Sequence, residues 1–200
     1  FVVADKRQDR VAELKDRYGV DTATNTEAAR EADVVVLVVK PQDIFTVVEE
    51  IAADLKPTAL VVSLAAGVTT SSLEALLPDG MPVVRVMPNT PALVDEGMSA
   101  VSPGAHCTPD HVALAVRLMA CVGKVVEVPE KMQDAVTAIS GSGPAYIFYT
   151  VEAMIEAGVG LGLPRRLATE LTLQTVYGAA TMLRETGEHP VVLRENVTSP

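Results

Sequence analysis

The most constraining feature of the sequence is a long apolar stretch in its second half. Between Ala145 and Ala157, only Thr150, Glu152 and Glu156 interrupt a run of apolar side chains. A helix formed by this stretch would be apolar on nearly all its sides, and such a helix must be buried. The fold therefore has to cover this helix, either within one subunit or against a second one.

A second helix is predicted directly after this stretch. It follows Pro164 and stops at Gly187, and a proline in the first turn with a glycine just past the last is the usual asymmetry of helix ends. Its segment 177–180 (Tyr-Gly-Ala-Ala) is small enough for close contact with another helix. Before the first helix, segment 140–144 (Ser-Gly-Ser-Gly-Pro) predicts a flexible turn with available backbone N–H groups, which we interpret as both a hinge and a wall of the site.

The first part of the chain shows short strands that alternate with helices. The β-branched run from Val34 to Val39 lacks an apolar–polar alternation, as expected for a parallel strand that is covered on both faces. Alternating strands and helices predict an α/β fold with a Rossmann-like, mostly parallel sheet. Ser71 or Thr70 is the expected N-cap of the third helix. The other expected strands are 1–4, 60–67, 83–87 and 124–128, and the expected helices are 8–18, 43–55, 71–77 and 109–121.

No strand pattern appears after Pro129, so we expect two domains. Residues 1–128 would form a dinucleotide-binding sheet domain, and residues 129–200 an all-helical dimerisation and substrate domain. A domain this small buries only about 60% of its surface, so the two apolar helices predict a homo-oligomer. The chain begins inside a strand at Phe1 and ends abruptly at Pro200, and we expect terminal segments to be missing at both ends.

Composition and spacing exclude several classes of function. The formal net charge of −10 argues against a nucleic-acid partner, and the aliphatic runs are far shorter than the roughly 20 residues that cross a membrane. Cys107 and Cys121 fit neither a metal site nor a disulfide framework, so we expect thiols in a reducing, cytoplasmic compartment. His106, His111 and His189 lack a second ligand at metal spacing, and no metal site is predicted.

The expected ligand site lies beyond the carboxyl ends of the parallel strands. Those ends carry small or basic residues, which suit an anionic ligand. Lys6 and Arg7 outweigh the single charge of Asp5 and favour a cofactor with a 2′-phosphate, although a solvated loop is the alternative. Lys40 could hold a cofactor or be a surface end cap, and Asn89 could line the site or belong to an ordinary turn.

The motifs at these strand ends and in the helical part resemble those of the pyrroline-5-carboxylate reductase family. The resemblance implies reduction of the cyclic imine 1-pyrroline-5-carboxylate to L-proline, the last step of proline biosynthesis, by hydride transfer from NADPH, with NADH as the alternative cofactor. It also implies a glycine-rich phosphate loop before Phe1 and a Gly-Gly-Thr continuation after Pro200, so we expect the chain by itself to bind NADPH weakly. The matching segments are 38–41 (VVKP), 65–68 (AAGV), 85–91 (RVMPNTP), 134–137 (DAVT), 141–146 (GSGPAY), 162–165 (GLPR), 189–190 (HP) and 197–200 (VTSP).

The resemblance also implies site residues by position. Thr198 and Ser199 would start the catalytic loop that holds the substrate carboxylate, and no general acid for the imine nitrogen is evident in the sequence. The implied cofactor-binding residues are Lys6, Arg7, Asn25, Val38, Val39, Lys40, Pro41, Ala65, Ala66 and Asn196. The implied substrate-lining residues are Met87, Pro88, Asn89, Gly141, Ser142, Gly143 and Val197.

Two other classes of protein remain as alternatives. A dehydrogenase of the β-hydroxyacid type shares a sheet domain followed by a helical domain, but it carries a catalytic lysine on the first long helix of the second domain, and residues 145–163 contain none. A non-catalytic nucleotide-binding dimerisation module would bind the cofactor without turnover. An assay for proline formation separates these readings.

Overall fold

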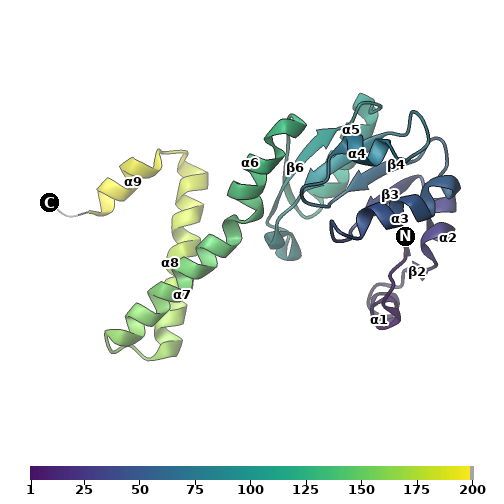
Figure 1. The fold of residues 1–200 in the computed structure, drawn as a ribbon. Coiled ribbons are helices and arrows are strands. Elements are labelled where there is room, and N and C mark those ends of the chain that lie inside the picture. Colours follow the sequence, from purple (N-terminus) through teal and green to yellow (C-terminus); the bar gives the residue numbers. More distant parts are fainter. Residues whose placement is uncertain (199–200) are drawn as a thin grey trace. The chain divides into compact units, whose positions relative to one another are not determined.

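In the computed structural model, which describes residues 1–198, the chain divides into a sheet unit, Phe1–Ser142, and a helical unit that starts at Gly143. Figure 1 shows the elements of each unit. This division lies later in the chain than the domain boundary predicted after Val128. The intervening segment, 129–142, belongs to the sheet unit, because Glu130 and Gln133 form hydrogen bonds with Thr70 and Ser102.

The sheet unit confirms the predicted mostly parallel sheet. Five strands lie in the order β3-β4-β5-β6-β7, and only the β5–β6 pair is antiparallel. The two short strands β1 and β2 form a separate parallel pair. The strands are β1 (Val2–Val3), β2 (Asp21–Thr22), β3 (Val34–Leu37), β4 (Leu60–Ser63), β5 (Val83–Met87), β6 (Gly97–Pro103) and β7 (Gly123–Glu127).

Helices cover both faces of this sheet. Along β4, Val61 packs into one core cluster with Ile44 and Leu73, whereas Leu60 and Val62 pack into another with Ala115. Successive side chains of a strand point to opposite faces, so a strand between two layers must be apolar throughout. The helices of this unit are α1 (Gln8–Tyr18), α2 (Asn25–Glu31), α3 (Ile44–Ile51), α4 (Thr70–Glu74) and α5 (Pro109–Ala120), with short 3₁₀ turns η1 (Ala52–Asp54), η2 (Thr90–Val94) and η3 (Glu130–Met132).

Three elements of the sheet unit were not anticipated. The strand β6 carries the buried serines Ser99 and Ser102, so it lacks the aliphatic run that marks the other strands. The helix α2 is preceded by the very short strand β2. Its start does have a sequence signal, because Thr24 and Glu27 form a capping box in which each side chain accepts the backbone N–H of the other residue.

The N-cap of α4 differs from the prediction. Thr69, rather than Thr70 or Ser71, caps the helix, since its side chain accepts the N–H of Ser72. The hydroxyl of Thr70 donates instead to Glu130 at 2.9 Å. A residue that appeared to cap a helix therefore holds a distant segment of the chain.

The predicted flexible turn at 140–144 is helical instead. The segment winds from α6 (Gln133–Val136) through a π-helical turn, η4 (Thr137–Gly141), and the N–H of Ser142 donates to the carbonyl of Thr137 at 2.8 Å. Single π turns inside helices often occur at functional sites. Gly141 is the last residue of this π turn, and Gly143 is the first residue of the next helix.

The helical unit contains the two long helices predicted from the apolar stretch and its successor. These are α7 (Gly143–Gly160) and α8 (Arg165–Thr186), followed by α9 (Pro190–Val197). The guanidinium of Arg165 pairs with the carboxylate of Glu156 at 2.6 and 3.0 Å, and this contact raises the pKa of Arg165 and lowers that of Glu156. Phe148 and Tyr149 of α7 are exposed, so residues 1–198 of one chain leave part of this apolar helix uncovered. None of the described helices is long and apolar enough to cross a membrane.

Candidate active site at the carboxyl ends of the strands

The loops after four strands lie along one edge of the sheet unit. Since β3, β4 and β5 are parallel, their carboxyl ends meet at this edge. The loop after β1 reaches the same edge, because the ammonium of Lys6 lies 3.4 Å from the carboxylate of Asp43, just before α3. Residues implied by sequence motifs far apart in the chain are therefore brought to one side of the sheet.

Lys6 and Arg7 are exposed at the β1 end of this edge. The guanidinium of Arg7 donates to the carboxylate of Asp9 at 2.6 Å, and this hydrogen bond raises the pKa of Arg7 and lowers the pKa of Asp9. The backbone N–H of Arg7 is held by Asp5 at 2.8 Å. Exposed ion pairs of this kind contribute little to stability, so a ligand phosphate can replace the carboxylates as partner of both cations.

The second group of implied cofactor residues follows β3 and includes Asn25. Lys40 is exposed after the strand, and its carbonyl accepts the N–H of Asp43 at 2.9 Å, which fixes the turn into α3. The amide of Asn25 donates to Glu50 on α3 at 2.8 Å. Val38 and Pro41 are exposed, whereas Val39 packs against the core.

The two alanines after β4 differ in their surroundings. Ala65 is buried in the core, and its N–H donates to the hydroxyl of Ser63 at 3.3 Å, whereas Ala66 is exposed. Only Ala66 can therefore offer its side chain to a ligand at this edge. The small size of both residues keeps the strand end open to close approach.

Five of the seven implied substrate-lining residues lie together at the end of β5, whereas Gly143 and Val197 belong to the helical unit. A Cβ atom added to Gly141 would lie 2.7 Å from the Cε atom of Met87, so these two residues are in direct contact. The side chain of Asn89 donates to the carbonyl of Ser140 at 3.1 Å. Pro88 and Ser142 are half-buried beside them, and Gly143 is the first residue of α7 in the helical unit.

Behind this wall lies a polar cluster that the sequence did not reveal. Glu130 accepts the N–H and the hydroxyl of Thr70 at 2.8 and 2.9 Å, and it pairs with the buried guanidinium of Arg85 at 3.4 Å. Gln133, with 0% of its surface exposed, donates to the hydroxyl of Ser102 at 2.7 Å. The sequence does contain one indication of this cluster. Arg85 is a charged residue in the middle of an otherwise apolar strand, and a buried charge requires a partner.

The remaining implied residues belong to the helical unit. Asn196 and Val197 form the end of α9 and are exposed, and the hydroxyl of Thr198 donates to the carbonyl of Arg194 at 3.0 Å. Ser199 lies outside the described residues.

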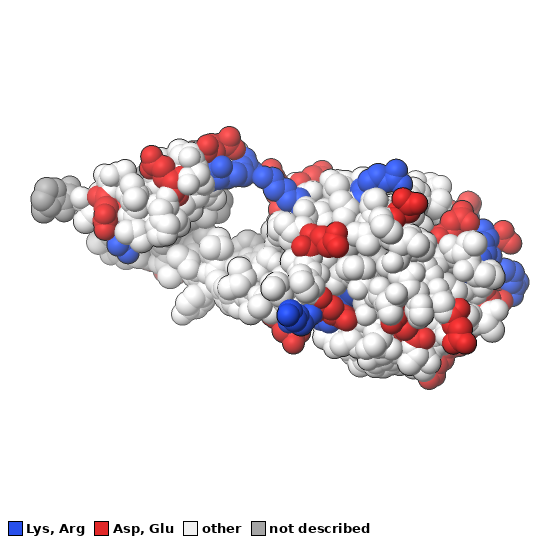
Figure 2. Space-filling view, turned by 90° about the horizontal axis from the view of Figure 1, so that it is seen from above, with Lys and Arg blue, Asp and Glu red and all other residues white. Residues whose placement is uncertain are grey.

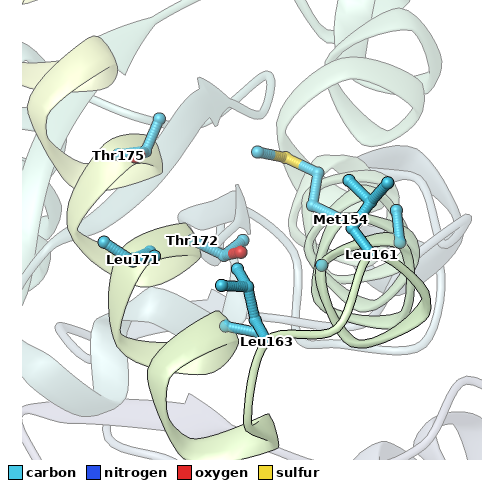
Figure 3. Close-up of a pocket in the computed structure, with 9 residues that line it drawn as sticks. Met154, Leu161, Leu163, Leu171, Thr172 and Thr175 are labelled. Carbon is cyan, nitrogen blue, oxygen red and sulfur yellow. The ribbon is translucent and has the colours of Figure 1, made fainter.

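A separate groove between α7 and α8 is apolar and carries no charged side chain. It encloses about 330 Å³. Figure 3 shows how Met154, Leu161 and Leu163 face Leu171, Thr172 and Thr175 across it. A groove lined in this way suits an apolar side chain better than a charged substrate.

We next consider charged patches on the face shown in Figure 2 and possible metal ligands among the described residues. On the face shown in Figure 2, Lys and Arg occur in small separate groups interspersed with Asp and Glu. Within residues 1–198, the His, Cys, Asp and Glu side chains do not gather in groups of three or more that could hold a metal ion.

Comparison with known proteins identifies the family. Residues 130–200 match the model for pyrroline-5-carboxylate reductase dimerisation, and residues 1–67 match the model described as NADP oxidoreductase coenzyme F420-dependent.

The pyrroline-5-carboxylate reductase of Corynebacterium melassecola is 48% identical over 99% of this chain and 75% of its own length. The solved structure of the Coxiella burnetii enzyme has a TM-score of 0.91 and 44% identity, and covers 100% of this chain and 75% of that one. The Plasmodium falciparum pyrroline carboxylate reductase structure with NADP bound has a TM-score of 0.87 and 31% identity, and covers 100% of this chain and 72% of that one. The chain, with its mostly parallel sheet and its helical dimerisation segment, therefore belongs to the pyrroline-5-carboxylate reductase family.

Proposed function

We propose that this chain carries out the NADPH-dependent reduction of 1-pyrroline-5-carboxylate to L-proline, with the substrate beside the cluster of Met87, Asn89 and Gly141. The observation that carries the proposal is the 48% identity to a pyrroline-5-carboxylate reductase over 99% of the chain. The proposal is supported by the contacts among Met87, Asn89 and the 140–141 turn, which come from two distant sequence segments and lie at a strand end, where α/β sheets bind their ligands.

The residues at the sheet edge fit a phosphorylated dinucleotide. Lys6 and Arg7 provide two exposed cations, whose present partners are surface carboxylates, and Lys40 provides a third beside β3. Ala66 presents little bulk at the neighbouring strand end. We assign Lys6 and Arg7 to the 2′-phosphate, and Asn25, Val38, Val39, Lys40, Pro41, Ala65 and Ala66 to the rest of the cofactor, with Asn196 contributing from the helical unit.

In this proposal the chain binds and orients the reactants and supplies no nucleophile. When bound, NADPH supplies the hydride that reduces the imine carbon. Met87, Pro88 and Gly141 exclude water from one side of the substrate, because their exposed groups are apolar or small. We assign residues 197–199, including the catalytic assignments Thr198 and Ser199, to the substrate carboxylate, for which the hydroxyl of Thr198 must exchange its bond to the carbonyl of Arg194. The imine nitrogen has to be protonated or hydrogen-bonded, because this makes the neighbouring carbon accept the hydride.

The helical unit supports a homodimer, in agreement with the dimerisation model that residues 130–200 match. Phe148 and Tyr149 of α7 and Tyr177 of α8 are between 64% and 75% exposed in a single chain. Exposed aromatic surface of this extent is typical of residues that a partner subunit covers. We propose that the dimer is cytoplasmic. We also propose that it has no nucleic-acid partner, since each chain carries a formal net charge of −10.

The test is the reaction itself. The full-length protein is mixed with NADPH and the cyclic imine, NADPH consumption is followed by absorbance, and L-proline is measured as product. Equal amounts of consumed NADPH and formed proline are expected. Binding of NADPH without turnover would instead favour the non-catalytic module, and oxidation of a hydroxyacid without imine reduction would favour a β-hydroxyacid-type dehydrogenase.

A further inference from the structure

Asn89 makes a hydrogen bond within the protein through each end of its side-chain amide, and these two bonds fix its orientation. Its carboxamide Oδ1 accepts the N–H of Met98 at 2.8 Å, and its Nδ2 donates to the carbonyl of Ser140 at 3.1 Å. The first contact fixes the orientation of the amide, because only the oxygen can accept from a backbone N–H. Both ends of the side chain are therefore used within the protein.

The contact with Ser140 meets a specific need of the backbone. In an α-helix the carbonyl of Ser140 would accept the N–H of the residue four positions later. That residue is Pro144, which has no N–H. The hydroxyl of Ser140 cannot help, since it already donates to the carbonyl of Val136 at 3.2 Å. A half-buried carbonyl in this position needs a donor, and Asn89 supplies one.

The same contact fixes the turn that forms part of the proposed substrate wall. Gly141 follows Ser140 directly and touches Met87, two residues before Asn89. The chain leading into the turn is held from the other side by Gln133 and Glu130, through their hydrogen bonds to Ser102 and Thr70. Asn89 is the contact that joins the turn itself to the end of β5.

We propose that Asn89 is a positioning residue, which holds the π turn at Thr137–Gly141 against the strand end and acts on the substrate through Gly141 and Met87 rather than by direct contact. This inference rests on the proposed reductase function. It replaces the direct role in lining the substrate that the family motif implied for Asn89. Pro144 cannot donate to the carbonyl of Ser140, and the amide of Asn89 donates to that carbonyl at 3.1 Å.

The sharpest variant is Asn89→Asp in the full-length protein. It keeps the acceptor for Met98 and replaces the donor to Ser140 with a charged oxygen that repels the carbonyl. We expect the KM for the imine to rise roughly five- to tenfold, as for the loss of one hydrogen bond, while the KM for NADPH is unchanged. The Ser142 amide, which closes the π turn, should exchange its hydrogen faster by a similar factor in the protein without ligands. Glu74→Ala is the matched control, since Glu74 also holds a backbone N–H, that of Ala105 at 2.8 Å, but lies outside the proposed site. It should change neither the imine KM nor the exchange of Ser142.

Each other outcome overturns the proposal. A raised imine KM with unchanged exchange at Ser142 would make Asn89 a direct substrate ligand. Faster exchange with unchanged kinetics would show that the turn does not position the substrate. The exchange measurement needs no substrate, so it still tests the contact if the wild-type protein fails to reduce the imine, a result that would count against the proposed function alone.

Discussion

At the scale of single residues, the sequence indicated which side chains lie close together better than it indicated their hydrogen-bond partners. Met87, Asn89 and Gly141 were implied by motifs and do lie together, but only the hydrogen bonds of Asn89 reveal that its amide is already used. Motifs record residue types at positions, whereas a role depends on partners far away in the chain. Arg85 and Glu130 escaped notice for the same reason, since they are 45 residues apart in sequence.

A substitution of Lys40 tests whether the cofactor binds at the carboxyl ends of the strands. If its ammonium holds the cofactor, Lys40→Ala should raise the apparent NADPH constant about tenfold, because a hydrogen bond to a charged group contributes roughly 1.5–3 kcal/mol. Titration of NADPH at saturating imine measures the constant. Lys56→Ala is the control, since Lys56 pairs with Asp33 on a different loop. An equal effect of both variants, or none at Lys40, would remove Lys40 from the site.

At the scale of elements, periodicity and helix-end signals predicted most of the sheet unit and both long helices. The strands between two layers were evident because they must be apolar throughout, and α8 because Pro164 and Gly187 mark its ends. The strand β6 was missed because the buried Ser99 and Ser102 interrupt its apolar pattern, and the hydroxyl of Ser102 donates to the carbonyl of Val128 at 2.7 Å. The π turn could not be foreseen, because glycines and serines before a proline equally suit an open turn.

The link between the segment 129–142 and the sheet can be tested through Glu130. Replacing it with alanine removes the nearer of the two carboxylates that pair with the buried Arg85 guanidinium, the other being Asp134 at 3.7 Å, and two hydrogen bonds from Thr70. We expect Glu130→Ala to lower the free energy of unfolding by about 1.5–3 kcal/mol, as for hydrogen bonds to a charged group. Denaturant unfolding measures it, and Glu127→Ala, at an exposed position of β7, is the control. Equal stability of the two variants would show that the cluster does not anchor this segment.

At the scale of the whole molecule, the same apolar helix that constrained the fold leads us to predict a second subunit, in agreement with the dimerisation model that residues 130–200 match. The groove between α7 and α8 is apolar (Figure 3). The aromatic side chains Phe148 and Tyr149 of α7 are exposed in a single chain. Obligate interfaces commonly bury more than about 2,000 Å² and resemble a domain core. The helices are predicted to meet their counterparts through Val151, Met154, Ile155 and Val159 on α7 and Leu171, Tyr177, Gly178 and Met182 on α8.

A substitution at Gly178 tests dimer formation without disturbing the folding of the subunit. A Cβ atom added there meets no other atom of the chain within 4 Å, so a larger side chain fits the single subunit. If α8 meets a partner at this point, Gly178→Leu should weaken the dimer by roughly 1–3 kcal/mol, because an overpacked interface forces the helices apart. Light scattering across micromolar concentrations should then show a shift toward monomer with an unchanged helical circular dichroism signal. Ala113→Leu adds a similar side chain to an exposed position of α5 and should leave the assembly intact. If the wild-type full-length protein is a folded monomer at these concentrations, the second subunit is not what covers α7 and α8.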